Sequence, residues 1–313
     1  MLEGWPPPIL DPAGPYAWPV SLLSWVLLAM AGAVLVVVVA ALWLALFGSK
    51  RARARVGGTN IVWLGGIVFP AVVLTALLIY GLTLTASLSD RIRGDEMRVR
   101  VTGEMWWWRV AYLGDDGEPT THDANELHIP VGEPVVLELE SADVIHSFWV
   151  PRLSGKLDMI PGRRNLMRIQ ADQSGVFGGQ CAEYCGGPHA LMGFVVVAHE
   201  PADFARLMEA RQTRESAPPP QADPRGAGLF ASAGCAACHR IAGTDANGLA
   251  GPDLTHVGSR RTVGGGILPN NRGTLMGWIA NSQAIKPNNR MPPYVVLPAE
   301  DLQAITSYLE AQR

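Results

Sequence analysis

The first ninety residues carry two long apolar runs separated by a short basic loop. Residues 20–49 contain no charged side chain, and a second uncharged run covers residues 56–89. Each run exceeds the roughly 20 apolar residues that a helix needs to cross the hydrocarbon layer of a membrane. A buried core helix usually stops sooner, at about 12 residues. The pattern therefore predicts two membrane-spanning helices, at about residues 20–47 and 61–85.

The loop between the two runs sets their orientation. It carries four basic residues, Lys50, Arg51, Arg53 and Arg55. Excess positive charge in a short loop marks the cytoplasmic side. The first 18 residues hold no Lys or Arg, which argues against a cleaved signal peptide. We therefore expect residues 1–92 to be an N-terminal segment and a helical hairpin in the cell (inner) membrane. The N-terminus and everything after about residue 90 would face the periplasmic or extracellular side.

After the second run the pattern changes to that of β-strands. "MRVRV" alternates apolar and basic residues, "VLELE" alternates leucine and glutamate, and "GFVVVAHE" is rich in β-branched side chains. Short strands separated by Gly, Pro and Asp are typical of a small antiparallel sandwich. The pattern assigns this domain to residues 93–211.

A proline-rich stretch then marks a second boundary. Residues 212–225 read "QTRESAPPPQADPR", which predicts a semi-rigid spacer. In the last segment, residues 226–313, Leu302, Ile305 and Leu309 fall on one helical face, so a small all-α domain is expected. Because such a spacer gives the tethered domain a high effective concentration, weak docking on the sandwich would suffice.

Charge and cysteine content narrow the chemistry. The formal net charge is −3, so nothing indicates nucleic-acid binding. Four cysteines are too few for a disulfide scaffold, and all four lie within two short segments, residues 181–192 and 234–239. The cysteines therefore point to metal or cofactor sites.

The first segment, "CAEYCGGPHALM", places Cys181, Cys185, His189 and Met192 within twelve residues. A disulfide between the cysteines and a zinc site are both alternatives, but neither uses the methionine. A blue copper centre takes one Cys, two His and a weak Met, and His146 is a candidate for the second histidine. Since two thiolates exceed what a single copper needs, the set favours two copper ions.

The second segment, "GCAACH", matches the C-x-x-C-H signature of covalent haem c. Cys235 and Cys238 would form the thioethers, and His239 would bind the iron. A thioredoxin-like redox pair is the alternative, but it expects a βαβ setting and no adjacent His. Methionine as sixth ligand raises a haem potential. Met291 is favoured for this role over Met276, which lies in a predicted amphipathic helix.

The chain from the hairpin to about residue 200 resembles subunit II of haem–copper cytochrome c oxidases. The resemblance lies in "DVIHSFWVPRLSGKLDMIPGR" and "GQCAEYCGGPHALMGF". It implies an all-β, cupredoxin-like Greek-key sandwich that holds the binuclear copper centre CuA. Carried over by position, it implies bridging thiolates from Cys181 and Cys185, terminal ligands His146, His189 and Met192, and the backbone carbonyl of Glu183. The Glu183 side chain would also help to hold magnesium at the boundary with the catalytic subunit.

The last segment resembles the small class I cytochrome c fold, in which a K-P-x-x-x-M-P loop carries the axial methionine.

In the oxidase family a G-x-Q-W-x-W segment lies over the copper site and receives the electron, which points to Trp106. Here Met105 replaces the glutamine, and no carboxylate lies near Asn60 at the start of the second span. The remaining histidines are expected to have surface or structural roles: His122, His128, His199 and His256.

Together these two resemblances imply the subunit at which electrons enter a proton-pumping terminal oxidase of the caa type, without oxygen chemistry of its own. The implied partners are the catalytic subunit I, other oxidase subunits, the lipid membrane, and an electron donor such as a quinol–cytochrome c reductase or a soluble cytochrome c. A donor subunit of a nitric oxide reductase-like complex is the first alternative. A copper chaperone is the second, but it needs neither Met192 nor a haem.

Overall fold

The computed structural model describes residues 8–88, 96–220 and 223–313. The chain divides into two units, one formed by Pro19–Ile92 and the other by Met1–Trp18 with Arg93–Arg313. The expected boundary between residues 92 and 93 lies outside the described residues. Each unit is described by itself.

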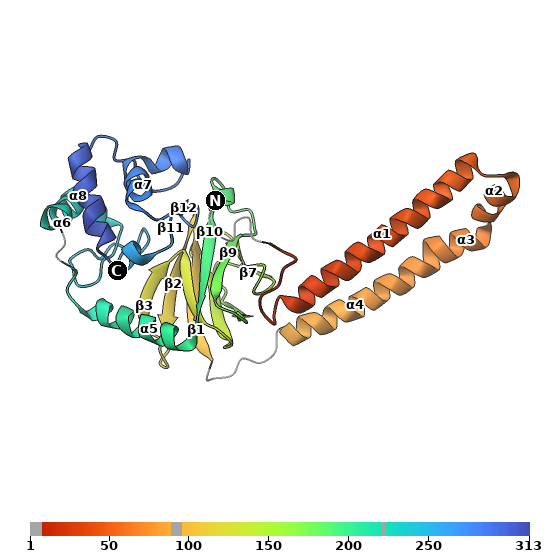
Figure 1. Cartoon of the computed structure of the whole chain (residues 1–313), viewed down its shortest axis with the longest axis horizontal. Helices are drawn as coiled ribbons and strands as arrows, with labels where there is room; N and C mark the ends of the chain where they lie inside the picture. Colours follow the sequence, from red (N-terminus) through yellow and green to blue (C-terminus); the bar gives the residue numbers. More distant parts are fainter. Residues whose placement is uncertain (1–7, 89–95, 221–222) are drawn as a thin grey trace. The chain divides into compact units, whose positions relative to one another are not determined.

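The smaller unit is a hairpin of two long helices (Figure 1). Its elements are α1 Trp18–Phe47, α2 Lys50–Val56, α3 Thr59–Trp63, the π-helical turn η1 Leu64–Val68, and α4 Phe69–Leu88. The two spanning helices, Trp18–Phe47 and Thr59–Leu88, are long and apolar enough to cross a membrane, and neither has its most apolar stretch buried within the protein. Val36, for example, is 68% exposed. Helices that are apolar all round and uncovered fit a lipid environment rather than a protein core.

Pro70 lies one residue into α4, directly after the π-helical turn Leu64–Val68. Proline lacks the N–H that would bond to the preceding turn and crowds that turn sterically. Widening the turn to π geometry is one way in which a helix accommodates such a residue. The second span therefore continues through Pro70 with a local distortion and no break.

The larger unit begins with a β-sandwich of two five-stranded sheets, which confirms the predicted cupredoxin-like fold class. The strand orders are β3-β2-β1-β5-β8 and β4-β10-β9-β6-β7. The strands are β1 Met97–Glu104, β2 Trp107–Leu113, β3 Pro119–Ala124, β4 Glu126–Pro130, β5 Val135–Ser141, β6 His146–Trp149, β7 Lys156–Met159, β8 Asn165–Ile169, β9 Gly175–Cys181 and β10 Gly193–His199.

The sequence pattern predicted an antiparallel sandwich, but two of the strand pairs are parallel. β1 pairs in parallel with β5, and β10 pairs in parallel with β4. Both partners are separated along the chain by other strands, so the connections cross between the sheets as in a Greek key. Alternation of apolar residues places a strand in a sheet but does not reveal its neighbour.

Aromatic residues fill the centre of the sandwich. Trp108 makes edge contacts with Phe148 and Phe194, each with ring centroids 5.8 Å apart. Cys181 and Cys185 belong to the same buried cluster. The predicted metal ligands are therefore rooted in a packed core, which restricts their movement.

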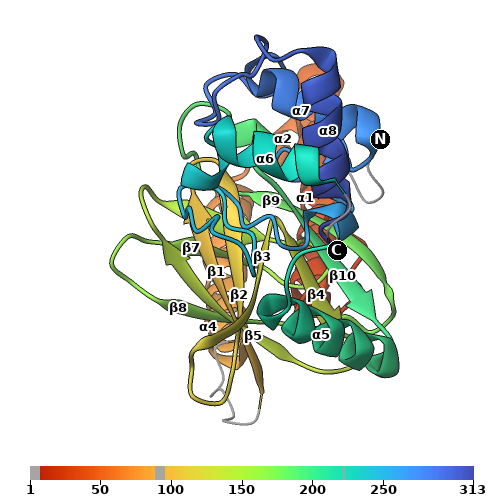
Figure 2. The same ribbon diagram turned by 90° about the vertical axis from the view of Figure 1, so that its left-hand side faces the viewer.

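The C-terminal domain is helical, as predicted (Figure 2). Its elements are α6 Pro224–Ser232, the 3₁₀ turns η3 Cys235–Ala237 and η4 Val257–Ser259, the short strands β11 Thr262–Val263 and β12 Leu268–Pro269, and the helices α7 Arg272–Ile285 and α8 Ala299–Glu310. Leu302, Ile305 and Leu309 are all buried, in agreement with the predicted helical face. α6 and α8 approach closely at Gly226, where a Cβ atom would lie 2.2 Å from the Ala304 carbonyl oxygen.

Helix α5, Pro201–Ser216, links the two domains and continues through the first five residues of the expected spacer. It lies against β3, β4 and β10. Arg211 and Arg214 are buried on this helix, with 3% and 8% exposure. A composition rich in polar residues and proline predicted a semi-rigid spacer over 212–225. Residues 212–216 of it are helical, and the two arginines have partners in both domains.

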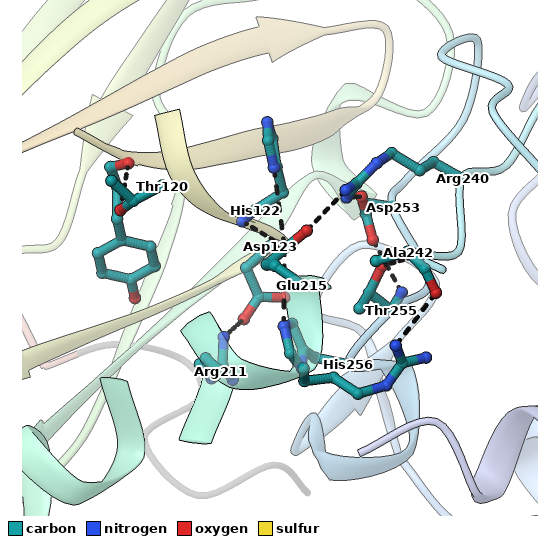
Figure 3. A network of polar contacts seen from close by, with 12 residues as sticks. Thr120, His122, Asp123, Arg211, Glu215, Arg240, Ala242, Asp253, Thr255 and His256 are labelled. Atoms are coloured by element: carbon teal, nitrogen blue, oxygen red, sulfur yellow. Dashed lines mark hydrogen bonds and ion pairs between the residues drawn. The ribbon is translucent and has the colours of Figure 1, made fainter. Parts of the chain in front are cut away.

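The central contact between the domains is a buried carboxylate, Asp123 of β3 (Figure 3). Arg211 of α5 donates to its Oδ2, and Nε of Arg260 in the cytochrome-like domain donates to its Oδ1 at 2.6 Å. Burial raises the pKa of Asp123, but the two guanidinium groups outweigh it and hold the pKa well below its usual range. Asp123 is therefore a charged group shared by sandwich, linking helix and helical domain.

A second chain of ion pairs runs beside the first (Figure 3). Glu215 of α5 lies 2.6 Å from Arg240, whose other terminal nitrogen lies 2.5 Å from Asp253. Burial raises the pKa of Glu215, but hydrogen bonds from His122 and Arg240 lower it to about 2. The helical domain thus contacts the sandwich and α5 through buried charged groups, and the expected weak docking through a spacer stays a prediction.

Replacing Asp123 tests this contact. Asp123→Asn should lower the free energy of unfolding by ~3 kcal/mol, because it leaves the charges of two buried arginines without their carboxylate. The measurement is chemical denaturation of the purified protein, followed by haem absorbance. The exposed Asp245 provides the matched control, and Asp245→Asn should change the free energy by less than about 0.5 kcal/mol. Equal effects of the two variants would contradict the proposed importance of Asp123.

Candidate metal and haem sites

The loop between β9 and β10, with the short 3₁₀ turn η2 His189–Leu191, brings the predicted copper ligands together. The Sγ atoms of Cys181 and Cys185 lie 3.8 Å apart. Nδ1 of His146 lies 3.9 Å from the first sulfur, and Nδ1 of His189 lies 3.4 Å from the second. His146 enters from β6, so two segments far apart in sequence build one site.

The two remaining predicted ligands complete the set. Sδ of Met192 lies 3.8 Å from Sγ of Cys185, and the carbonyl oxygen of Glu183 lies 3.2 Å from Sγ of Cys181. A disulfide needs sulfurs about 2.05 Å apart, and both cysteines are free. Two thiolates, two imidazoles, a thioether and a carbonyl form a soft donor set that suits copper.

Hydrogen bonds link the side chains of this site. Those from Cys185 and His146 outweigh burial and lower the pKa of Cys181, which favours its thiolate, whereas the same contact with Cys181 raises the pKa of Cys185. Nε2 of His146 lies 2.9 Å from Oδ1 of Asp143, leaving Nδ1 directed at the sulfurs. The backbone N–H of Met105 donates to Oδ2 of the same aspartate at 2.8 Å. Because this contact uses the backbone N–H, it does not require the glutamine side chain that the oxidase family has at the position of Met105.

A cavity of about 440 Å³ lies in the helical domain where the haem motif predicts it. Cys235, Cys238, His239 and Met291 all line it. Nδ1 of His239 donates to the carbonyl oxygen of Pro252 at 2.7 Å, which leaves Nε2 free for iron. Burial lowers the pKa of His239, so the neutral, metal-binding form is favoured. These residues fit a covalently bound haem with two axial ligands.

The loop that carries Met291 is fixed by hydrogen bonds. The carbonyl oxygen of Met291 accepts from Ser282 Oγ at 2.9 Å, and the N–H of Met291 donates to Asn289 Oδ1 at 2.8 Å. Met276 packs against the core of the domain and is not among the residues that line the cavity. The arrangement supports Met291 as the sixth ligand.

Trp106 lies between the two sites. Its side chain lines the haem cavity, and its indole N–H donates to the carbonyl oxygen of Cys185 at 2.9 Å. At Gly187 a Cβ atom would lie 2.8 Å from the indole ring, so the ring and the copper loop meet in close contact. The predicted tryptophan thus contacts the loop that holds the copper ligands and faces the haem pocket.

Lys286 is a residue that the sequence analysis did not single out. It is 3% exposed, and its Nζ donates to the carbonyl oxygens of Trp106 at 2.7 Å and Gly264 at 3.1 Å. Burial lowers its pKa to about 7. Lys286 is the first residue of the K-P-x-x-x-M-P motif. The sequence therefore contained a signal for this lysine, but the motif was used only to locate the loop that carries Met291.

The other four histidines lie in or near the contact between the domains. His128 and His199 stack with ring centroids 5.1 Å apart, and their facing nitrogens lie 2.8 Å apart. His256 is buried, and burial lowers its pKa to about 4. Within the described ranges, the residues grouped closely enough to hold a metal are His146, Cys181 and Cys185. The contacts of these histidines fit the structural role expected of them.

Comparison with known proteins agrees with this geometry. Residues 115–199 match the family described as cytochrome c oxidase subunit II, periplasmic domain, and residues 224–312 match cytochrome c. Cytochrome c oxidase subunit 2 of Alkalihalophilus pseudofirmus is 33% identical over 317 residues, covering 96% of this chain and 90% of the relative. The same subunit of Bacillus sp. strain PS3 is 32% identical over 270 residues, covering 80% and 73%.

A solved structure of the periplasmic domain of subunit II of cytochrome oxidase from Bradyrhizobium japonicum is 32% identical. It matches 39% of this chain and 97% of that domain, with a TM-score of 0.34.

Fold and sites define a membrane-anchored electron-transfer subunit with one copper domain and one haem c domain. More particularly, the chain belongs to the cytochrome c oxidase subunit 2 family, and its C-terminal cytochrome c domain fits the caa type. Family membership implies copper and haem c as cofactors. It also implies association with the catalytic subunit and other subunits of a haem–copper oxidase.

The choice of Met291 can be tested by substitution. Met291→Leu should abolish the weak near-infrared sulfur–iron band of the oxidised haem and lower its potential, because a thioether ligand raises the potential. Absorption spectroscopy and a redox titration measure both effects. Met276→Leu removes a methionine from the same domain and should leave the band in place. Loss of the band in the Met276 variant alone would show that the ligand is misassigned.

Proposed function

We propose that this chain is the subunit at which electrons enter a proton-pumping terminal oxidase. Bound in the two sites, haem c and copper supply one-electron redox chemistry, so that electrons pass from an external donor by way of haem c and then copper to the catalytic subunit, which reduces oxygen to water. The chain's own residues hold these cofactors, set their ligands and fix the contact between them.

The proposed copper centre is binuclear. Cys181 and Cys185 provide the bridging thiolates, and the other four donors are arranged around them. With His146 nearest one sulfur and His189 nearest the other, each sulfur has its own imidazole neighbour. This even distribution of donors about a sulfur pair supports two coppers, because a single blue site uses one thiolate.

The observation that carries the proposed transfer between the two sites is the position of Trp106. A residue that lines the haem cavity also donates a hydrogen bond to Cys185 in the copper loop. The haem-binding residues and the copper-binding residues therefore meet at one residue, Trp106.

Further proposals concern the surroundings of the oxidase. The Glu183 side chain is half-buried, and its carboxylate has no ion pair with another described residue. It is therefore proposed to hold magnesium together with the partner subunit.

The positive loop of the hairpin supports a periplasmic or extracellular position for both cofactor domains. The donor is proposed to be a quinol–cytochrome c reductase or a soluble cytochrome c.

Metal content and spectroscopy test the binuclear site. The protein should hold about two coppers and show a mixed-valence electron paramagnetic resonance signal shared between both ions. Cys185→Ser should abolish that signal and leave the haem absorbance intact, because the haem ligands lie in the other domain. A single-copper blue signal in the unchanged protein would contradict the proposal.

Truncation tests the order of transfer. Ending the chain after Ala217 removes the cytochrome domain but keeps α5, so Arg211 still pairs with Asp123. The truncated oxidase should lose most turnover with the native donor, yet accept electrons from a small artificial reductant. In the intact oxidase, stopped-flow absorbance should show haem reduction before copper reduction, at a rate independent of protein concentration. Unchanged turnover after truncation, or copper reduced first, would refute this order.

A further inference from the structure

A loop of three consecutive glycines lies at the joint between the haem and copper domains. Gly264, Gly265 and Gly266 have φ values of 72°, 83° and 81°, a conformation that disfavours any side chain. The carbonyl oxygen of Gly265 accepts a hydrogen bond from the N–H of Gly193 at 2.8 Å. Gly193 directly follows the proposed copper ligand Met192, so this loop contacts the copper site from the haem side.

Lys286 reaches into the same joint. A Cβ atom at Gly265 would lie 2.7 Å from Nζ of Lys286 and 3.3 Å from the carbonyl oxygen of Trp106. The glycine thus leaves the space through which the lysine reaches the copper domain. Nζ of Lys286 donates to one carbonyl oxygen in each domain, that of Gly264 in the haem domain and that of Trp106 in the copper domain.

Stability alone does not account for this lysine. A buried ammonium group has lost its hydration, and the hydrogen bonds it makes here go to two neutral carbonyl oxygens. Apolar residues of similar size often replace even a buried ion pair without loss of stability. A buried lysine that bonds to one backbone carbonyl oxygen in each domain therefore points to a role in placing those two peptides.

Trp106 is consequently held at both ends. Its backbone carbonyl accepts from Lys286, and its indole N–H donates to Cys185. The first contact belongs to the segment that leads from α7 into the Met291 loop, and the second to the copper loop. Motion of either loop would be transmitted to the same side chain.

We propose that Lys286 is a positioning residue for electron transfer, which holds the Trp106 peptide against the haem domain so that the indole stays in contact with the copper loop. The proposal rests on the proposed function, because it assumes that electrons pass from the haem site to the copper site. The lysine itself binds neither cofactor and acts through the tryptophan.

The test uses the complete oxidase with both cofactors bound. Lys286→Met keeps the length of the side chain but removes its donor. Flash reduction of the haem, followed at separate haem and copper bands, should show transfer slowed roughly tenfold, the factor expected for loss of one charge-assisted hydrogen bond. Redox titration of both centres corrects the rate for any change in driving force. The mixed-valence copper signal and the sulfur–iron haem band should remain.

Glu215→Gln is the matched control, because it removes a charged contact across the same interface but touches neither Trp106 nor the Met291 loop. Its transfer rate should stay close to that of the unchanged protein, because Asp123 still joins the two domains through Arg211 and Arg260. Equal slowing in both variants would show that Lys286 only holds the domains together, and an unchanged rate in Lys286→Met would also overturn the proposal. Absence of haem-to-copper transfer in the unchanged oxidase would instead refute the proposed function.

Hydrogen exchange supplies a readout that does not depend on turnover. The Trp107 N–H belongs to the same peptide as the carbonyl oxygen that Lys286 binds. Its exchange should accelerate roughly tenfold in Lys286→Met and in the shorter Lys286→Gln, and remain unchanged in Glu215→Gln. Full protection of this N–H in both lysine variants would overturn the positioning role, even if a variant bound haem poorly.

Discussion

The arrangement of the two cofactor domains depends on the buried carboxylate of Asp123. It lies on the sandwich and binds one arginine from the linking helix and one from the cytochrome domain, Arg211 and Arg260. An unpaired charge at this depth would be strongly destabilising, so the three groups are needed together. Because each comes from a different part of the chain, satisfying one charge also fixes the position of the helical domain on the sandwich.

The same contact brings the two sites together. Trp106 lines the haem cavity, and its indole N–H donates to the carbonyl oxygen of Cys185 in the copper loop. At Gly265, where a Cβ atom would lie 2.7 Å from Nζ of Lys286, the missing side chain leaves room for the lysine to reach the Trp106 carbonyl oxygen. In the proposed function, electron transfer between the sites therefore needs no diffusional encounter.

The sequence predicted those features that local patterns encode. Long uncharged runs identified the hairpin, and the spacing of Cys181, Cys185, His189 and Met192 identified a site whose atoms the fold does bring together. Features that depend on tertiary contacts were not predictable. The parallel pairing of β1 with β5 leaves no mark on either strand, and α5 extends into the proline-rich segment only because Arg211 and Arg214 find buried partners. Lys286 was overlooked because its partners are backbone carbonyls, which no sequence motif shows.

The central claim is that the cytochrome domain occupies one fixed position on the copper domain. The most direct measurement is the distance between the haem iron and the copper centre, obtained by pulsed electron paramagnetic resonance on the frozen, oxidised protein. A domain held in one position gives a single narrow distance distribution, and replacing Asp123 by asparagine should broaden it. A broad distribution in the unchanged protein, like that of a domain on a free tether, would contradict it.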